Sequence, residues 1–190
     1  AQSYLESKNV IKIGITGTSG KTTTKEFIKA ILSQKYNVYA NFGNFNNQVG
    51  VPLSALEVEN NHDIAIFEMG TGKWGDIKHL SKIIKPDFAL VTSVGPGHLE
   101  YFKSVEQIAK EKASISTFSK MSICPNDILF EKEFNHFKKI NKDIFKIKQE
   151  NNSSYLIQYK NEEINFPFWR DFNLSNLALA VHVAKELKLS

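Results

Sequence analysis

The chain has 190 residues, of which 42% are hydrophobic and 23% are charged. These values are ordinary for a soluble globular protein, and the length suits one domain with or without a small appendage. The formal net charge is +4, but of the 24 lysines and arginines only Arg170 is an arginine, and a dedicated nucleic-acid surface would favour arginine. The lone Cys124 excludes an internal disulfide, and no apolar stretch has membrane-spanning length. We therefore expect a cytoplasmic protein that neither inserts into membranes nor binds nucleic acid.

The first two thirds of the chain alternate strand-like and helix-like segments. The predicted strands are Val10–Ile15, Val38–Ala40, Asp63–Phe67, Phe88–Thr92 and Met121–Cys124. The predicted helices are Thr22–Gln34, Val51–Glu57, Gly75–Ile84, Ser104–Phe118 and Phe130–Ile140. This alternation predicts an α/β fold, a three-layer α/β/α domain in which helices cover both faces of a mainly parallel sheet.

The region 143–166 has a different pattern. Its short alternating runs Ile144–Lys148, Ser154–Tyr159 and Glu163–Phe166 are separated by turn-forming residues, so they predict a small antiparallel hairpin appendage. A last helix is predicted at Phe172–Leu187. Acidic residues interrupt the lysine-rich stretch Lys132–Lys148, which indicates a solvated surface in preference to a nucleic-acid patch.

The segment from Ile11 to Thr23 joins a β-branched run to a glycine-rich turn that ends in Gly20-Lys21-Thr22 and opens a helix. Glycines let backbone N–H groups approach an anion, and a helix N-terminus adds partial positive charge. Lys21 can reach terminal phosphates, and the Thr22 hydroxyl can ligate Mg²⁺. The pattern departs from the strict phosphate-loop motif because Ile15 stands five residues before Gly20. A plain glycine turn is the alternative.

Polar residues follow two further predicted strands. Glu68 comes directly after the strand that ends at Phe67, and His98 lies in the loop after the strand at residues 88–92. Because parallel strands end at one edge of a sheet, we expect Thr22, Glu68 and His98 to lie near one another. A carboxylate there suits Mg²⁺, although a solvated carboxylate and a loop-capping histidine are the alternatives.

Lys112 has an unusual position in its predicted helix. Ser104 and Gln107 form a capping box, so the helix starts at Ser104. The helical spacing places Lys112 between Ile108 and Ile115 on the apolar stripe, where a bare ammonium is costly. Such a lysine commonly extends to the surface, so an inward Lys112 would need a functional reason.

Five segments occur in the order typical of the central ATPase domain of the Mur ligases. They are Thr16-Gly-Thr-Ser-Gly-Lys-Thr22, Gly43-Asn-Phe-Asn-Asn-Gln-Val-Gly-Val-Pro52, Phe67-Glu-Met-Gly70, Gly97-His-Leu-Glu100 and Ala109-Lys-Glu-Lys112. The chain therefore resembles this family over Ile11 to Leu187, most closely the member that adds D-alanyl-D-alanine to UDP-MurNAc-tripeptide. The resemblance implies an ATP-dependent amide ligase of peptidoglycan precursor synthesis, acting through an acyl phosphate, with ATP and Mg²⁺ as cofactors and those two compounds as partners of a monomeric enzyme.

The resemblance also implies roles for individual residues. The nucleotide would be bound by Thr18, Ser19, Gly20, Lys21, Thr22 and Thr23, with Asn173 and Asn176 near the adenine, although Asn173 could instead cap its helix. The metal ligands would be Thr22, Glu68, His98 and Lys112, the last as an N-carboxylated (carbamate) side chain, and Lys21, Glu68, His98 and Lys112 would form the catalytic set. Asn44, Asn46 and Asn47 would lie close to ATP and the nucleotide-sugar substrate; an Asn-Gly turn is the alternative.

Three positions depart from the family pattern. Ser114 stands where Glu is common, Phe172 where His is usual, and Gly97 where other members have Asp. We expect residues 1–190 to be the central ATP-binding domain, without the family's N-terminal nucleotide-sugar and C-terminal amine-substrate domains, and inactive in ligation alone. The alternatives are another Mur or folylpolyglutamate-type ligase, a regulatory phosphate-loop NTPase, or an interaction domain with a relic loop.

Overall fold

A six-stranded parallel sheet forms the centre of the computed structural model, which describes residues 1–97, 101–150, 154–167 and 171–189. Its strands are β1 (Ile11–Thr16), β2 (Val38–Ala40), β3 (Ile64–Glu68), β4 (Phe88–Val91), β5 (Met121–Pro125) and β6 (Lys138–Ile140). The helices are α1 (Gln2–Glu6), α2 (Lys21–Leu32), α3 (Gly50–Leu56), α4 (Asp76–Ile84), α5 (Val105–Ala113) and α6 (Asp171–Glu186). All five predicted strands, and the helices at α2, α3, α4 and α6, are confirmed to within two residues at each end.

The strand order β2-β3-β1-β4-β5-β6 places β1 between β3 and β4. Ile15 is opposite Glu68 of β3, and Thr16 is opposite Val91 of β4. Because these strands are parallel and end at the same level, the loops that follow them meet at one edge of the sheet. The phosphate-loop glycines, Glu68 and the segment after β4 are brought together in this way.

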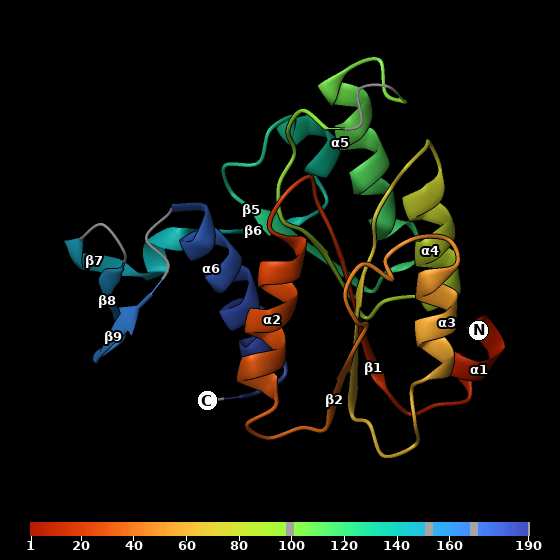
Figure 1. Ribbon diagram of the computed structural model, residues 1–190. Helices are drawn as coiled ribbons and strands as arrows, with labels where there is room; N and C mark the ends of the chain where they lie inside the picture. The colour runs from red at the N-terminus through yellow and green to blue at the C-terminus, as the bar shows by residue number, and fades with distance from the viewer. Residues whose placement is uncertain (98–100, 151–153, 168–170, 190) are drawn as a thin grey trace.

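Helices cover both faces of the sheet, as the alternation predicts. The helices α2 and α6 lie on one face, and α1, α3, α4 and α5 lie on the other (Figure 1). Strand residues alternate between two buried clusters: Ile13 and Ile15 pack with Ile28 and Leu179 on the α2–α6 side, whereas Phe67 packs on the other side. The predicted three-layer fold is confirmed.

The hairpin appendage is also confirmed. The strands β7 (Lys146–Glu150), β8 (Tyr155–Tyr159) and β9 (Glu162–Phe166) form an antiparallel sheet in that order. Tyr155, Ile157 and Phe166 join the cluster beneath α2 and α6, and the rings of Phe27 and Phe166 lie 5.8 Å apart. The appendage therefore shares the α2–α6 core.

The predicted helix Phe130–Ile140 is wrong. A short 3-10 turn at Glu131–Phe134 is followed by β6, which extends the parallel sheet beside β5. Phe130 has a φ of 57°, which no helix accommodates, and pairing with the edge of β5 overrides helical propensity.

The predicted helix Ser104–Phe118 is correct only in its first part. Ser104 caps α5 by accepting a hydrogen bond from the Gln107 N–H at 3.2 Å, but α5 ends at Ala113 and continues as a 3-10 helix over Ser114–Phe118. The hydroxyl of Ser114 donates to the Glu111 carbonyl at 2.5 Å, and such local bonds compete with a regular helix.

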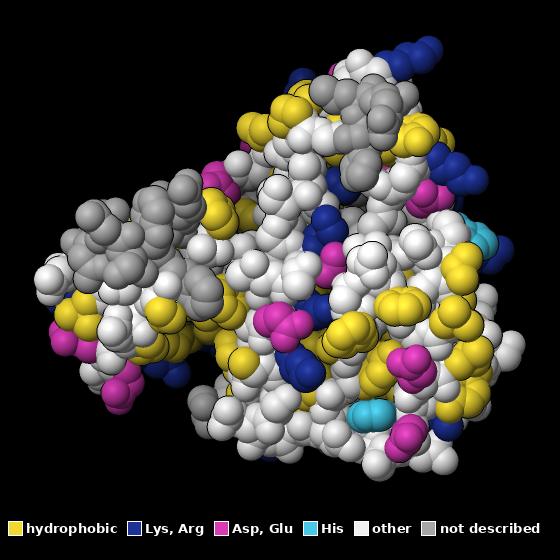
Figure 2. Space-filling model, viewed as in Figure 1, with side chains coloured by type: hydrophobic (Ala, Val, Ile, Leu, Met, Phe, Trp, Pro, Cys, Tyr) yellow, Lys and Arg dark blue, Asp and Glu magenta, His cyan; other side chains and the backbone are white. Residues whose placement is uncertain are grey.

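The surface carries apolar side chains around α3 (Figure 2). They comprise Phe42 and Val49, which are 81% and 67% exposed, with Phe45, Leu53 and Leu56. Over the part of the chain that the structure describes, no helix is both long and apolar enough to cross a bilayer.

Candidate functional site

The phosphate loop between β1 and α2 is fastened to the segment that follows β4. The backbone N–H of Ser19 donates to the Ser93 hydroxyl at 3.0 Å, and the Thr92 hydroxyl donates to the Ser19 carbonyl at 2.5 Å. The Thr18 N–H donates to the Ser93 carbonyl at 3.0 Å. These bonds use the N–H groups of Thr18 and Ser19 and fix the path of the loop that leads into α2.

Two glycines of this loop are required by conformation and by space. Gly17 and Gly20 have φ angles of 155° and 85°, which L side chains rarely adopt. A Cβ atom on Gly17 would lie 2.0 Å from Thr92 Oγ1, and one on Gly20 would lie 2.7 Å from Asn176 Oδ1. The loop therefore packs directly against α6 and against the segment that follows β4.

The N-terminus of α2 faces this loop. Gly20 precedes the helix and has no side chain to cap it, so the first-turn N–H groups suit an anion. Lys21 Nζ donates to the Gly17 carbonyl at 2.9 Å, and burial lowers the pKa of this amine while Glu68 opposes the shift. Free helix donors beside a partly buried lysine fit a bound phosphate. Thr23 is half-buried in the same turn.

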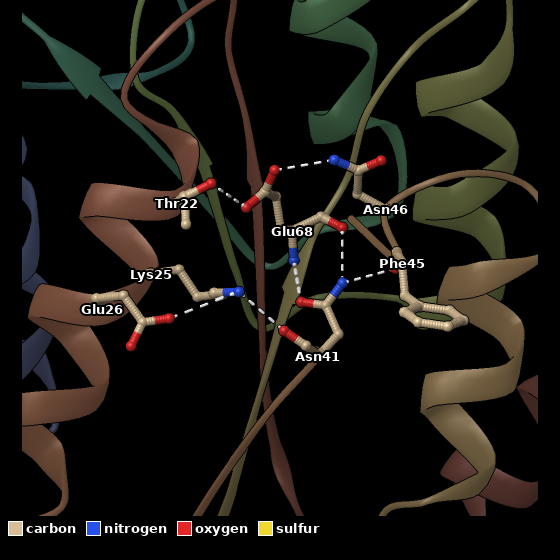
Figure 3. A network of polar contacts seen from close by, with 7 residues as sticks. All are labelled: Thr22, Lys25, Glu26, Asn41, Phe45, Asn46 and Glu68. Carbon is tan, nitrogen blue, oxygen red and sulfur yellow. Dashed lines mark hydrogen bonds and ion pairs between the residues drawn. The ribbon is translucent and has the colours of Figure 1, made fainter. Parts of the chain in front are cut away.

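Glu68 lies at the end of β3 with 3% of its surface exposed. The Thr22 hydroxyl donates to Glu68 Oε2 at 2.8 Å, and the Asn46 amide donates to Glu68 Oε1 at 2.9 Å (Figure 3). The carboxylate therefore joins the first turn of α2 to the asparagine-rich loop, as the topology predicts for Thr22 and Glu68.

Asn41 binds the backbone of Glu68, and it was not predicted from the sequence. Its Oδ1 accepts a hydrogen bond from the Glu68 N–H at 2.8 Å, and its Nδ2 donates to the Glu68 carbonyl at 3.2 Å (Figure 3). The carbonyl of Asn41 accepts a 2.8 Å bond from Lys25 Nζ, which lies 3.6 Å from Glu26 Oε1. The only signal in the sequence is a polar residue directly after a short strand.

The donor set around Glu68 fits Mg²⁺. Thr22 and Glu68 supply hard oxygen atoms, and Mg²⁺ in nucleotide sites is commonly held by one or two carboxylates together with phosphate oxygens. Within the described ranges, no group of three or more His, Cys, Asp or Glu side chains could hold a metal unaided. With two protein oxygen ligands, phosphate oxygens and water would complete the shell of a Mg²⁺ ion here. His98 lies outside the described residues, so its predicted place beside Glu68 stays a prediction.

Lys112 is only 3% exposed, so its side chain points inward and does not extend to the surface, which was the common alternative. It lines a cavity of about 280 Å³, which we call the lysine cavity. The other lining residues are Gly17, Lys21, Asn46, Asn47, Gly70, Thr71, Gly72 and Asp76. Burial and the charge of Lys21 lower the pKa of Lys112 to about 8, and Glu111 opposes this shift. Two amines from elements distant in the sequence thus line one cavity.

Two buried carboxylates beside this cavity were missed by sequence reasoning. Asp76 Oδ2 accepts hydrogen bonds from the N–H groups of Gly72 and Lys73, both at 2.9 Å. Glu111, which precedes Lys112 on α5, accepts bonds from the start of α4. In the sequence both look like ordinary charged helix positions.

The three asparagines predicted near substrate have different placements. Asn46 binds Glu68 and lines the lysine cavity. Asn47 lines the same cavity, and its Oδ1 accepts bonds from the N–H groups of Val49 and Gly50 at 3.0 and 2.8 Å, which caps α3. Asn44 is exposed and lines neither cavity described here.

A second cavity, of about 660 Å³, lies on the other side of the phosphate loop, and we call it the apolar cavity. Among its lining residues are Thr18, Ser19, Gly20, Pro125, Ile128, Leu129, Phe172 and Asn176. Asn176 is 3% exposed, and its Nδ2 has no hydrogen-bond partner among the described residues. An amide donor beside apolar walls suits a planar heterocycle. Asn173, which was predicted with Asn176, is half-buried and does not line the cavity.

Comparison with protein families gives a match to the Mur ligase middle domain over residues 15–184. Among curated proteins, the chain is 43% identical over 115 residues to the UDP-N-acetylmuramoyl-tripeptide–D-alanyl-D-alanine ligase of Borreliella burgdorferi. That alignment covers 60% of this chain and 25% of the relative. The chain therefore spans about a quarter of the length of this relative.

Solved structures give the same picture. MurF ligase from Thermotoga maritima in complex with ADP superposes with a TM-score of 0.85 and 29% identity, covering 100% of this chain and 48% of that one. MurF from Acinetobacter baumannii gives a TM-score of 0.86 and 26% identity, covering 98% and 45%. This chain is thus similar to somewhat less than half of each structure.

Proposed function

Because this chain belongs to the Mur ligase family, as its middle domain, we propose that it is the ATP-binding core of a ligase that adds D-alanyl-D-alanine to UDP-MurNAc-tripeptide. The observation that carries this proposal is the lysine cavity, where Lys21 of the phosphate loop and Lys112 of α5 face one space. Asn46, which binds Glu68, is on its wall. The substrates are those in the names of the relatives.

The phosphate loop is proposed to hold the triphosphate of ATP. The N-terminus of α2 and the amine of Lys21 would neutralise the phosphates, and the Thr22 hydroxyl would face the metal that accompanies them. The apolar cavity would hold the nucleoside, with Asn176 donating to the base and Phe172 against its face. The Thermotoga maritima relative was solved in complex with ADP, which supports nucleotide binding by this fold.

Thr22 and Glu68 are proposed to bind Mg²⁺, with His98 as a further predicted ligand. The metal would supply positive charge where phosphate charge develops during transfer. Asn41 and Asn46 hold the Glu68 backbone and carboxylate in place.

Lys112 is proposed to react with CO₂ and become a carbamate. The neutral amine would form a bond from Nζ to the carbon of CO₂ and release a proton to solvent, leaving an oxygen ligand where a cation stood. A pKa of about 8 supports this step because about a tenth of the amine is neutral at pH 7, against fewer than about one in a thousand for a lysine with a pKa near 10.5.

The proposed reaction is a ligation in two steps. A carboxylate oxygen of the tripeptide attacks the γ-phosphorus of ATP, and ADP leaves with the electron pair. The amine of D-alanyl-D-alanine then attacks the acyl carbon, loses a proton, and expels phosphate. The contribution of this chain is electrostatic and positional, since Lys21 and the α2 N-terminus would stabilise the charge on the transferring group.

The proposal includes a setting for the enzyme. We infer a cytoplasmic monomer in which residues 1–190 act as the central domain, with the sugar-nucleotide and amine substrates held largely by other domains. Light scattering of the full-length protein tests the monomer, and a species of twice the chain mass would contradict it. Ligation of the tripeptide by residues 1–190 alone would contradict the division of labour.

The decisive experiment is ATP hydrolysis by the full-length protein, with and without UDP-MurNAc-tripeptide and D-alanyl-D-alanine. We expect ADP to form at an appreciable rate only when both substrates are present, in step with the pentapeptide product. Hydrolysis independent of both substrates, and unchanged by Lys112→Ala, would instead indicate a regulatory NTPase. Another amine that supports turnover better would identify a different ligase of the same family.

A further inference from the structure

Glu111 is a buried carboxylate that the proposed function does not use. Its side chain is 1% exposed, on α5, one residue before Lys112. Its oxygens accept hydrogen bonds from the N–H groups of Gly75 at 2.7 Å and Ile77 at 2.8 Å, and from the Thr71 hydroxyl at 3.4 Å. A charged group buried to this degree is costly unless its bonds are all made in place.

These bonds attach α5 to the beginning of α4. Gly75 precedes α4 in a left-handed conformation, and as a glycine it offers no side chain to bind the first-turn donors. Glu111, on a different helix, accepts hydrogen bonds at the start of α4 as a capping residue would. Its negative charge is favourable at a helix N-terminus. The start of α4 and the Lys112 end of α5 are therefore held together by one carboxylate.

The same attachment reaches the walls of the lysine cavity. Thr71 and Asp76 line the cavity and lie in the segment that Glu111 binds. Asp76 holds the neighbouring loop through the N–H of Gly72, and its carboxylate accepts a bond from Gln48 Nε2 at 3.1 Å. Gln48 follows Asn47, so three walls of the cavity are connected through two carboxylates.

We propose that Glu111 is a positioning residue, which fixes Lys112 in the lysine cavity by tying α5 to the β3–α4 loop and the start of α4. The inference rests on the proposed function for the role of Lys112, but the contacts that carry it do not. Glu111 lines neither the lysine cavity nor the apolar cavity, so we assign it no contact with phosphate or reacting atoms. Its effect passes through the placement of the amine beside it.

The test compares Glu111→Gln with Glu106→Gln in the full-length protein. Both residues are glutamates of α5, but Glu106 is 53% exposed in its side chain and pairs with Lys110 on the surface, so it is a matched control. Gln at position 111 keeps the shape, removes the charge and replaces one acceptor by a donor. Amide hydrogen exchange at Gly75 and Ile77 should become about tenfold faster in Glu111→Gln and stay unchanged in Glu106→Gln.

A second measurement distinguishes local displacement from general loss of structure. Lys112 and Lys25 are 3% and 2% exposed, so each reacts slowly with an amine-acetylating reagent, and mass spectrometry can follow both in one sample. In Glu111→Gln we expect acetylation of Lys112 to rise about tenfold while that of Lys25, on α2, is unchanged. Equal acceleration of both lysines, or unchanged acetylation of Lys112, would overturn the proposal.

Ligation kinetics complete the test. Glu111→Gln should lower kcat about tenfold and leave the KM for ATP unchanged, because the hydrogen bonds of Glu111 go to Thr71, Gly75 and Ile77, which lie outside the phosphate loop. If Glu111→Gln keeps full activity while Lys112→Ala loses it, the positioning role of Glu111 is overturned and the proposed function is not. Absence of ligation in the wild-type protein would overturn the proposed function, and the acetylation comparison would still decide the role of Glu111.

Discussion

The two cavities on either side of the phosphate loop differ in chemistry. The apolar cavity has walls of proline, isoleucine, leucine and phenylalanine with one unpartnered amide among the described residues, and Asp127 and Lys142 also line it. The smaller lysine cavity holds two amines and a carboxylate. The loop separates a space that suits a neutral ring from one that suits charge in transfer. In the proposed function, the nucleoside is bound in the apolar cavity and phosphoryl transfer takes place at the lysine cavity. Variants can therefore perturb the two separately.

The largest effect is expected from Lys21→Ala, which removes the amine shared by the loop and the lysine cavity. We expect ATP turnover by the full-length protein to fall by about 100-fold to 1000-fold, since a preorganised charge at the transferring phosphate is lost. Lys29→Ala, at the exposed end of the same helix, is the control. A loss of less than tenfold would place the chemistry elsewhere.

Lys112→Met should stabilise the fold at neutral pH. Because burial lowers the pKa of Lys112 from 10.5 to about 8, the unfolded chain binds its proton more tightly, which costs about 3 kcal/mol of stability at pH 7. This cost disappears as pH rises from about 8 to about 10.5, so the advantage of Met should shrink over that window. Urea unfolding in metal-free buffer purged of CO₂ measures it.

The exposed Lys73→Met is the matched control for that experiment. Lys73→Met should change the free energy of unfolding little at pH 7 and at about pH 10.5. A Lys112→Met protein that is less stable than wild type at pH 7 would show that the ammonium is well solvated in the lysine cavity.

Phe172→Ala tests the apolar cavity by itself. Phe172 is 57% exposed on the wall of this cavity, and loss of a stacking ring should weaken ATP binding about tenfold in calorimetry. Affinity for inorganic tripolyphosphate should not change, because that ligand needs only the phosphate loop. An equal loss of affinity for ATP and for tripolyphosphate would show that the two cavities are not separate in function. Phe42→Ala, at a distant exposed ring, is the control.

The smallest effect is expected from Asn47→Ala. Its side chain caps α3, so the free energy of unfolding should fall by about 1 kcal/mol, whereas Asn44→Ala should have no measurable effect. Thermal melting of the two variants provides the comparison. Identical melting temperatures would mean that the bonds to Val49 and Gly50 contribute nothing.

The parallel sheet could be predicted from sequence because its strands are short apolar runs between amphipathic helices. The meeting of Thr22 with Glu68 also follows from topology, since strand ends share an edge. The place of Lys112 on the buried face of α5 follows from helical spacing. These three results depend on periodicity and chain order, which a sequence displays directly.

Other features depend on approaches between distant segments. Glu111 and Asp76 bind backbone N–H groups, and a backbone donor leaves no signature in the side-chain pattern. The segment at residues 130–140 has helical spacing, but the free edge of β5 pairs with it and makes β6. Contacts between segments far apart in the chain determine these features, and a local sequence pattern does not reveal such contacts.

The contact between Gly20 and Asn176 has a consequence for biosynthesis. Gly20 is made early, but the side chain that closes the loop from behind belongs to α6, about 150 residues later in the chain. During synthesis on a ribosome, the phosphate loop would emerge long before Asn176. The apolar side of α2 would stay uncovered until α6 is made. We expect nascent chains that end before α6 to engage ATP poorly and to need protection until synthesis passes the last helix.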